Sequence, residues 1–260
     1  MKYKTGVVLS GGGVKGIGHI AYLERLEELG VRPDVISGTS SGAMIGAMYA
    51  AGHKPKDMIQ FFKTTSFFKM KWLTRRKPGI FDSISYINLV KDQLPARFED
   101  LDIPIFVTAV NIADCSIQYF HQGELHTPLI ASCAVPFLIS PVEMGNKMFG
   151  DGGIMDNYPI TPIKDHTEIL IGCYGSRPVQ KDKEQLNSTL RVMNHAYELL
   201  MFANNAYKFT STKNTTILPL SGFGSFNTAE VDDIYKASKA YLSKIDPTEM
   251  KKDEYLSIIV

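Results

Sequence analysis

The first 52 residues contain the same pattern twice: a short apolar run ends in a glycine-rich turn, and a helix-like segment follows the turn. The first copy comprises residues 5–10, three glycines and a predicted helix over residues 15–29. The second comprises residues 34–37, a turn centred on Ser40 and a small-residue helix ending near residue 51. Strands that alternate with helices in this way form parallel sheets covered by helices. The pattern therefore predicts an α/β fold with a mainly parallel central sheet.

The alternation resumes later in the chain. We expect further strands over residues 104–109, 116–120 and 168–173, and helices over residues 190–209 and 231–245. Leu190, Met193, Tyr197 and Leu200 share one face of the first of these helices. Residues 53–100 interrupt the pattern, and we expect them to form a cap-like insertion. With 260 residues, 44% of them hydrophobic, and no repeat or linker, the chain is predicted to form one domain over residues 1–260.

Composition excludes several classes of function. A net charge of +1 gives no global attraction for nucleic acid. The six histidines form no cluster with metal-ligand spacing, so we expect no metal and no cofactor. Three cysteines without close spacing favour free thiols in a reducing compartment. No apolar run approaches the ~20 residues of a membrane span. The sequence therefore predicts a cytoplasmic protein.

The first turn, Gly11-Gly12-Gly13-Val14-Lys15-Gly16, fits the dinucleotide-binding pattern G-x-G-x-x-G, and Asp34 follows 18 residues after Gly16. In a nucleotide site, however, the acidic residue stands at the carboxyl end of the second strand, whereas Asp34 precedes that strand. Consecutive glycines at a helix start can also direct backbone N–H groups at one point. The favoured interpretation is an oxyanion hole formed by Gly11, Gly12 and Gly13.

The second turn, Gly38-Thr39-Ser40-Ser41-Gly42, matches G-x-S-x-G between a strand and a helix. Gly38 and Gly42 permit the sharp turn that exposes a nucleophilic Ser40. By itself the motif also fits a serine that caps the following helix. A nucleophilic serine needs a base, and Asp151 in Gly150-Asp151-Gly152-Gly153 is the candidate, since a glycine-rich segment can approach another loop closely.

The three motifs, in this order and at these separations, closely resemble the patatin-like phospholipase family. The stretch from Ala131 to Pro136 also looks like the small-residue helix and proline typical of that family. The resemblance covers roughly residues 5–180. It implies a three-layer α/β/α fold, a Ser40–Asp151 dyad, an oxyanion hole from the glycine loop, and hydrolysis of lipid or phospholipid acyl esters.

The sequence is also compatible with other functions and with another catalytic mechanism. On the same dyad, an acyltransferase would use a second alcohol or thiol in place of water. A non-catalytic lipid-binding protein would keep the motifs without activity. His166 and His195 follow Asp151 and so keep the chain order of a Ser–Asp–His triad.

Residues 61–81 combine aromatic and basic side chains and contain no acid. This composition suits peripheral contact with an anionic membrane surface. The same aromatics also suit a cap whose rings pack inward or line an acyl pocket.

Overall fold

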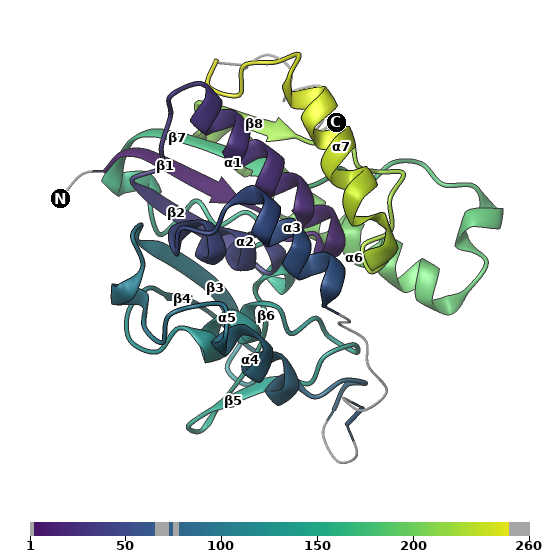
Figure 1. The fold of residues 1–260 in the computed structure, drawn as a ribbon. Helices are drawn as coiled ribbons and strands as arrows, with labels where there is room; N and C mark the ends of the chain where they lie inside the picture. Colours follow the sequence, from purple (N-terminus) through teal and green to yellow (C-terminus); the bar gives the residue numbers. More distant parts are fainter. Residues whose placement is uncertain (1–2, 66–72, 75–77, 250–260) are drawn as a thin grey trace.

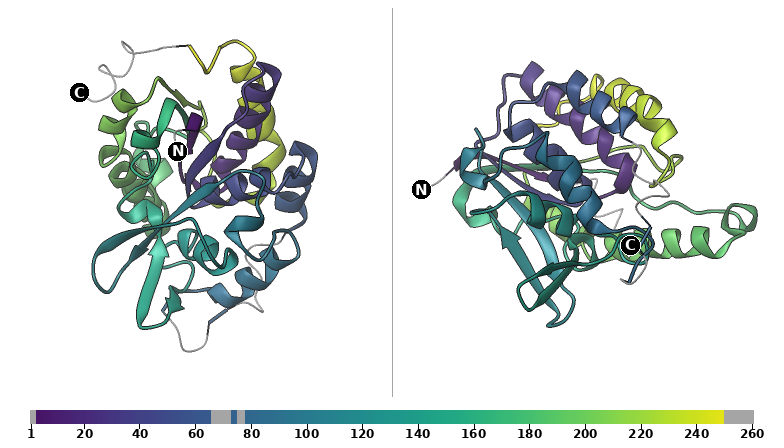
Figure 2. Two further views of the ribbon diagram at one scale, coloured as in Figure 1. Left: turned by 90° about the vertical axis from the view of Figure 1, so that its left-hand side faces the viewer. Right: turned by 60° about the horizontal axis from the view of Figure 1, so that its bottom comes forward.

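In the computed structural model, which describes residues 3–65, 73–74 and 78–249, an eight-stranded sheet lies between helices on both sides (Figures 1 and 2). Hydrogen-bonded neighbours follow the order β5-β6-β3-β2-β1-β7-β8. β2 and β6 pair with successive stretches of one edge of β3, and β4 pairs with the opposite edge. The strands are β1 Tyr3–Leu9, β2 Val35–Thr39, β3 Ile105–Asn111, β4 Ser116–Phe120, β5 Val142–Met144, β6 Lys147–Asp151, β7 Thr167–Tyr174 and β8 Asn214–Ile217.

Five strands are parallel, namely β1, β2, β3, β7 and β8, whereas β4, β5 and β6 run antiparallel to their neighbours. The predicted mainly parallel sheet of a three-layer α/β/α fold is therefore confirmed. The α-helices are α1 Gly18–Glu28, α2 Ser41–Ala50, α3 Pro55–Thr64, α4 Ser83–Lys91, α5 His126–Ser132, α6 Thr189–Ala203 and α7 Val231–Leu242.

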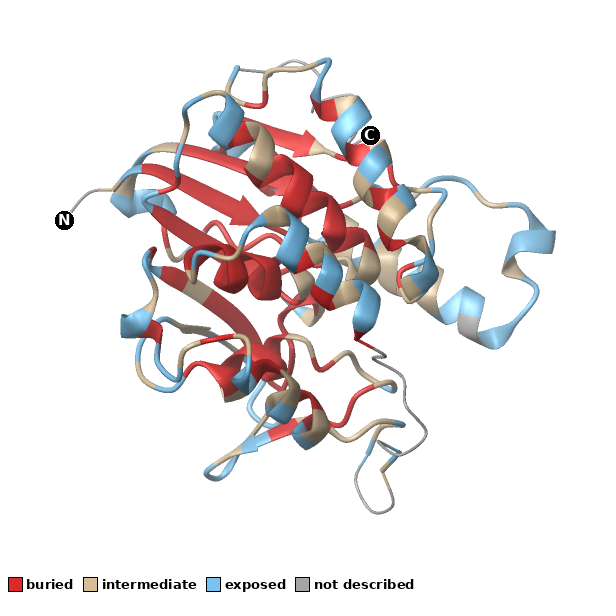
Figure 3. Cartoon of the chain, in the orientation of Figure 1, coloured by how far each residue is buried: buried red, intermediate tan, exposed pale blue. Residues whose placement is uncertain are grey.

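Strand alternation divides the core between the two faces of the sheet, because successive side chains point to opposite faces. Val7 and Leu9 of β1 pack with the apolar residues of α1 and α2, whereas Val8 packs with Tyr158 and Phe209 on the other face. The residues named here are all buried. Figure 3 shows the central strands and the helices packed on them largely in the colour of buried residues. Parallel strands that are buried on both faces consist of nearly uninterrupted apolar residues, which agrees with the short apolar runs in the sequence.

Several predicted elements end earlier or begin later than expected. The predicted helix over residues 15–29 is a 3₁₀ turn, Gly13–Ile17, followed by α1. The helix over residues 190–209 ends at Ala203, and a separate 3₁₀ segment, Ala206–Ser211, follows Asn205. The small-residue helix expected from Ala131 onward in fact ends at Ser132, so Cys133 to Pro136 form its exit loop. Cys115 is exposed in a turn, whereas Cys173 is buried.

Candidate active site

Ser40 stands in a sharp turn between β2 and α2. Its backbone has φ 53° and ψ −125°, a region that costs a non-glycine residue energy, and its N–H donates to Ser132 Oγ at 2.8 Å. A Cβ on Gly42 would strike the carbonyls of Leu9 and Ser10, so only glycine lets α2 start so close to β1. The chain thus holds a strained serine at the carboxyl end of a central parallel strand.

Asp151 is the last residue of β6, and its side chain is 2% exposed. Its N–H donates to the carbonyl of Ala134 at 3.0 Å, and its Oδ1 accepts from the Gly153 N–H at 2.7 Å. The Ser40 side chain lies beside this carboxyl group in the wall of the same cavity and lowers its pKa. A Cβ on Gly152 would strike the Thr108 carbonyl, which explains why this segment needs a residue without a side chain.

Burial controls the acidity of this carboxyl group. Removal from water raises the pKa of Asp151 from 3.8 to about 7, and the hydrogen bonds from Gly153 and Ser40 oppose that rise. A carboxylate with a pKa near neutrality accepts a proton from a hydroxyl more readily than an exposed aspartate does.

The glycine loop lies beside this pair. The Gly11 N–H donates to the Asn157 carbonyl at 3.3 Å, while no acceptor for the Gly12 or Gly13 N–H is found in the described part of the chain. Gly13 has φ 60°, and the next N–H, of Val14, donates to the Ser225 carbonyl at 2.8 Å. The buried His19 supports the loop through its Nε2, 2.8 Å from the Ser10 carbonyl oxygen. Two of the three predicted donors are therefore available to a ligand.

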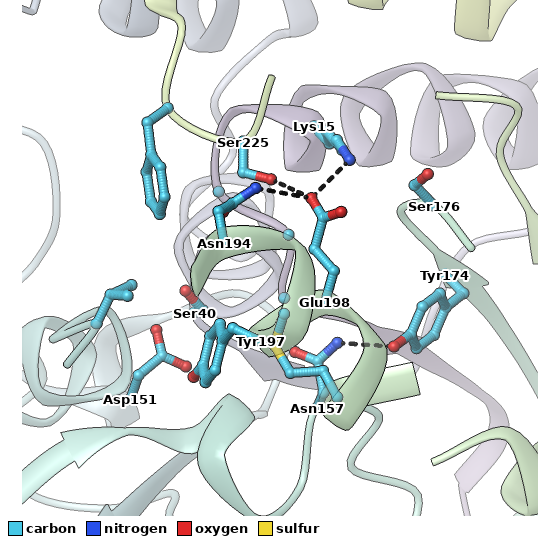
Figure 4. Close-up of a pocket in the computed structure, with 16 residues that line it drawn as sticks. Lys15, Ser40, Asp151, Asn157, Tyr174, Ser176, Asn194, Tyr197, Glu198 and Ser225 are labelled. Atoms are coloured by element: carbon cyan, nitrogen blue, oxygen red, sulfur yellow. Dashed lines mark hydrogen bonds and ion pairs between the residues drawn. The ribbon is translucent and has the colours of Figure 1, made fainter. Parts of the chain in front are cut away.

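Two cavities meet at Ser40. A polar cavity, drawn in Figure 4, is lined by the glycine loop, Asp151 and side chains of α6. An apolar cavity extends from Ser40 past Met44, Phe62, Tyr86, Ile130 and Leu138. One serine hydroxyl therefore lies between an apolar compartment and a polar one.

Comparison with known proteins identifies the family. The sequence profile of the patatin-like phospholipases matches residues 7–163, which is more than half of the chain and contains all three motifs. The chain belongs to the patatin-like phospholipase family.

Relatives extend this assignment. Lysophospholipase NTE1 of Cryptococcus neoformans is 30% identical over 185 residues, covering 66% of this chain and 11% of the fungal protein. An uncharacterized NTE family protein of Mycobacterium tuberculosis is 29% identical over 167 residues, covering 62% of this chain and 45% of its own length. The chain thus spans about a tenth of the fungal protein and less than half of the mycobacterial one.

Among solved structures, VipD from Legionella pneumophila matches with a TM-score of 0.52 at 14% identity, over 94% of this chain and 67% of VipD. At this identity the match concerns the fold alone.

In this member of the family the polar cavity also contains a buried ion pair that the sequence did not reveal. Lys15 Nζ lies 2.9 Å from Glu198 Oε1, and Ser225 Oγ donates to the same oxygen at 2.7 Å (Figure 4). Burial disfavours the charge of Glu198, but Lys15, Ser225 and Lys181 together hold its pKa below the usual value. The only sequence signal was the cation within the glycine motif, since Glu198 comes 183 residues later.

Neither histidine of the alternative triad lines these cavities. His166 is exposed and directly precedes β7, whose carboxyl end is the one near the glycine loop, so about 23 Å of strand separates it from the site. His195 lies on α6 with its Nδ1 3.8 Å from Glu198 Oε2. Asp34 also lies at the far end of the sheet, where it accepts the Thr5 N–H at 2.7 Å. This position does not fit a ribose ligand of a dinucleotide site.

The predicted interfacial segment, residues 61–81, is described only in part, because residues 66–72 and 75–77 lie outside the described residues. Phe61 is buried, and Phe62 lines the apolar cavity. These two rings therefore point inward. In the described residues, no helix has the length and apolar character needed to cross a bilayer.

Proposed function

We propose that the chain hydrolyses acyl esters of lipids, as a phospholipase A or lysophospholipase-type serine esterase, with Ser40 as nucleophile and Asp151 as base. One observation carries the proposal: Ser40, in a strained turn, lies beside the buried carboxyl group of Asp151 at the meeting point of an apolar and a polar cavity. An ester of a fatty acid with a polar alcohol likewise joins an apolar part, the acyl chain, to a polar part, the alcohol.

In the acylation step, Asp151 accepts the proton of Ser40 Oγ as that oxygen attacks the ester carbonyl carbon. The N–H groups of Gly12 and Gly13 hold the oxyanion, because the Gly11 N–H is already donated to Asn157. When the tetrahedral intermediate collapses, the carbon–oxygen bond to the alcohol breaks, and Asp151 returns the proton to the departing oxygen. The fatty acyl group remains on Ser40.

In the deacylation step, Asp151 takes a proton from water as the water oxygen attacks the acyl carbon. The bond to Ser40 Oγ then breaks, the proton returns to Oγ, and the fatty acid leaves. The same two glycine N–H groups stabilise the second oxyanion. No metal or cofactor enters this cycle.

The two cavities favour a lipid with a single acyl chain. The chain would occupy the apolar cavity beside Met44 and Tyr86, and the alcohol with its polar group would face Lys15, Asn194 and Glu198. The lysophospholipase names of the fungal relatives support this substrate class.

The test is covalent labelling with a fluorophosphonate, read by intact mass and mapped to a residue. We expect one adduct, on Ser40, and loss of both labelling and p-nitrophenyl ester hydrolysis in Ser40→Ala at an unchanged melting temperature. Labelling elsewhere would refute the nucleophile. Labelling without ester hydrolysis, together with turnover that depends on an added alcohol or thiol, would favour an acyltransferase. If folded protein gives neither labelling nor turnover but binds lipid, the motifs are not catalytic.

Peripheral membrane contact through residues 61–81 is a separate part of the proposal and rests on their basic and aromatic composition. Replacing Lys69, Lys71, Arg75 and Arg76 with Gln should weaken sedimentation with anionic vesicles, and added salt should have the same effect on the wild type. If vesicle binding responds neither to these substitutions nor to added salt, residues 61–81 do not mediate membrane contact and form only a cap.

A further inference from the structure

Helix α6 directs its polar side chains toward the catalytic cavity. Asn194, Tyr197 and Glu198 line that cavity together with Met201, at the i, i+3, i+4 spacing of one helix face (Figure 4). Glu198 is held there by the buried contact with Lys15. This contact fixes which side of α6 faces the body of the protein.

The opposite face of α6 is apolar and exposed. Val192 is 49% exposed, Met193 38%, Leu199 48% and Leu200 61%. Ala196 and Ala203 on the same face are also exposed. A helix of a soluble protein normally has the reverse arrangement, with its apolar stripe on the core. Among the exposed large hydrophobic residues of the described chain, four come from this one helix, and such a concentration marks an interaction surface.

The charge on α6 points to the kind of partner. Only Arg191 and Glu198 are charged between Thr189 and Ala203, and the Glu198 carboxylate faces inward. Arg191 precedes Glu198 by about two helical turns and therefore lies on the same side of the helix, so the outward face carries no charged side chain. An uncharged apolar helix face fits the apolar layer of a phospholipid surface.

The size of the patch argues against a second copy of this chain. The four large side chains together expose about as much surface as two fully exposed ones, which is roughly 400 Å² or less. A stable dimer needs about 800 Å² from each partner. A helix that sinks a few ångströms into a lipid surface needs only one such stripe.

We propose that the exposed apolar face of α6 (Val192, Met193, Ala196, Leu199 and Leu200) docks on the surface of a phospholipid bilayer. The choice of a lipid partner rests on the proposed function. Since the other face of α6 forms a wall of the polar cavity, docking places that cavity one helix away from the lipid surface. This surface is distinct from residues 61–81, and its binding depends on apolar contact more than on anionic lipid.

The test uses a matched pair of alanines. Ala196→Asp places a charge in the middle of the α6 face, and Ala240→Asp places the same charge on an exposed position of α7. Both are measured for co-sedimentation with phosphatidylcholine vesicles and for hydrolysis of p-nitrophenyl butyrate in solution. Leu200→Asp is a second variant of the α6 face, and Leu200→Phe is its apolar counterpart.

We expect Ala196→Asp and Leu200→Asp to weaken vesicle binding at least ~10-fold, since a carboxylate must be dehydrated to enter the interface. Ala240→Asp and Leu200→Phe should bind as the wild type does, and butyrate hydrolysis should stay within about twofold in all four, because no cavity side chain changes. Equal losses in both alanine variants, or a wild type that does not bind, would overturn the proposal. So would a wild-type dimer in light scattering that Ala196→Asp converts to a monomer, because the face would then bind a second copy.

The two proposals fail separately. A wild type that binds phosphatidylcholine through α6 but does not cleave soluble esters refutes the esterase and keeps the docking face. A wild type that cleaves soluble esters but does not bind vesicles refutes the docking face and keeps the esterase.

Discussion

Thr39 and Asp151 lie one after the other along the same edge of β3, where Thr39 pairs with Thr108 and Asp151 pairs with Ala109. The other edge of β3 is taken by β4 over the same residues, so β2 and β6 must share this one. Ser40 follows Thr39 directly. The register of one strand therefore brings together a serine and a carboxylate that are 111 residues apart in the sequence.

This arrangement predicts the effect of removing the base. Asp151→Asn keeps the shape of the side chain and an acceptor for the Gly153 N–H, but it cannot take the Ser40 proton. We expect kcat for a short-chain ester to fall at least ~100-fold, the scale of general-base catalysis.

The matched controls are His166→Ala and His195→Ala, which should each retain most of the activity because neither ring lines the cavities. A mild effect of Asp151→Asn with a large loss in either histidine variant would mean a histidine-dependent triad. Melting temperatures of all three variants separate lost folding from lost chemistry.

The pH profile follows from the pKa of Asp151, raised by burial to about 7. The base works only when ionised, so kcat/KM should rise about tenfold per pH unit below 7 and level off above it. From the sequence alone, a carboxylate base is expected to stay active below the histidine range near pH ~6.5. Because burial raises the pKa of Asp151 into the histidine range, the pH profile does not distinguish a carboxylate base from a histidine base. The Asp151→Asn, His166→Ala and His195→Ala variants identify the base. An acid limb near pH 4 would contradict the buried, desolvated carboxyl group.

How much the sequence could predict depended on local signals. β1, β2 and the turn around Ser40 were predictable because each apolar run ends in glycines that the backbone there requires, as at Gly42. β5, β6 and β8 were missed, since they are short or polar strands defined by their pairing with neighbours. The break after Ala203 was missed because Asn204 and Asn205 are compatible with a helix, and only the fold shows Asn205 bonded to Tyr158.

The candidate site also contains some residues that the sequence predicted and others that it did not reveal. Ser40 and Asp151 were predicted from their glycine-rich surroundings, and the structure brings them together, while their catalytic roles stay predictions. Glu198 was missed because a glutamate in an amphipathic helix has no local mark of burial. Helix periodicity alone would place Met193 and Leu200 on the core, but both residues are exposed. The cytoplasmic location and the single-domain division with a cap over residues 53–100 also stay predictions.

The raised pKa of Asp151 also predicts a stability effect. The folded state holds the proton up to about pH 7, whereas the unfolded chain releases it near pH 3.8, so ionisation of Asp151 makes stability fall as pH rises from about 4 to 7. Asp151→Asn removes this penalty. Relative to the wild type, the variant should gain on the order of 3 kcal/mol of unfolding free energy between pH 5 and pH 8. Denaturant titrations at the two pH values measure the gap, with Asp233→Asn on an exposed position of α7 as control. If the difference in unfolding free energy between variant and wild type instead shrinks as pH rises, the pKa of Asp151 is not raised in the folded state.

The buried pair of Lys15 and Glu198 gives the last prediction. Their side chains are 5% and 13% exposed, so Lys15→Met leaves a carboxylate in the cavity wall without its main counter-ion. We expect this variant to lose about 3 kcal/mol of unfolding free energy. Glu198→Gln in the Lys15→Met background should recover part of the loss, because it removes the uncompensated charge.

A double-mutant cycle measures the coupling between the two side chains, expected at roughly 1–3 kcal/mol. The matched comparison is Lys63 and Asp232, a pair with a similar distance of 2.7 Å whose side chains are 43% and 48% exposed. Water screens that pair, so its coupling should stay below about 1 kcal/mol. Because the buried contact joins the glycine loop to α6, its loss should also lower the protection of α6 amides in hydrogen exchange. Equal coupling in the two cycles, with α6 protection unchanged, would mean that Lys15 and Glu198 do not hold this helix over the cavity.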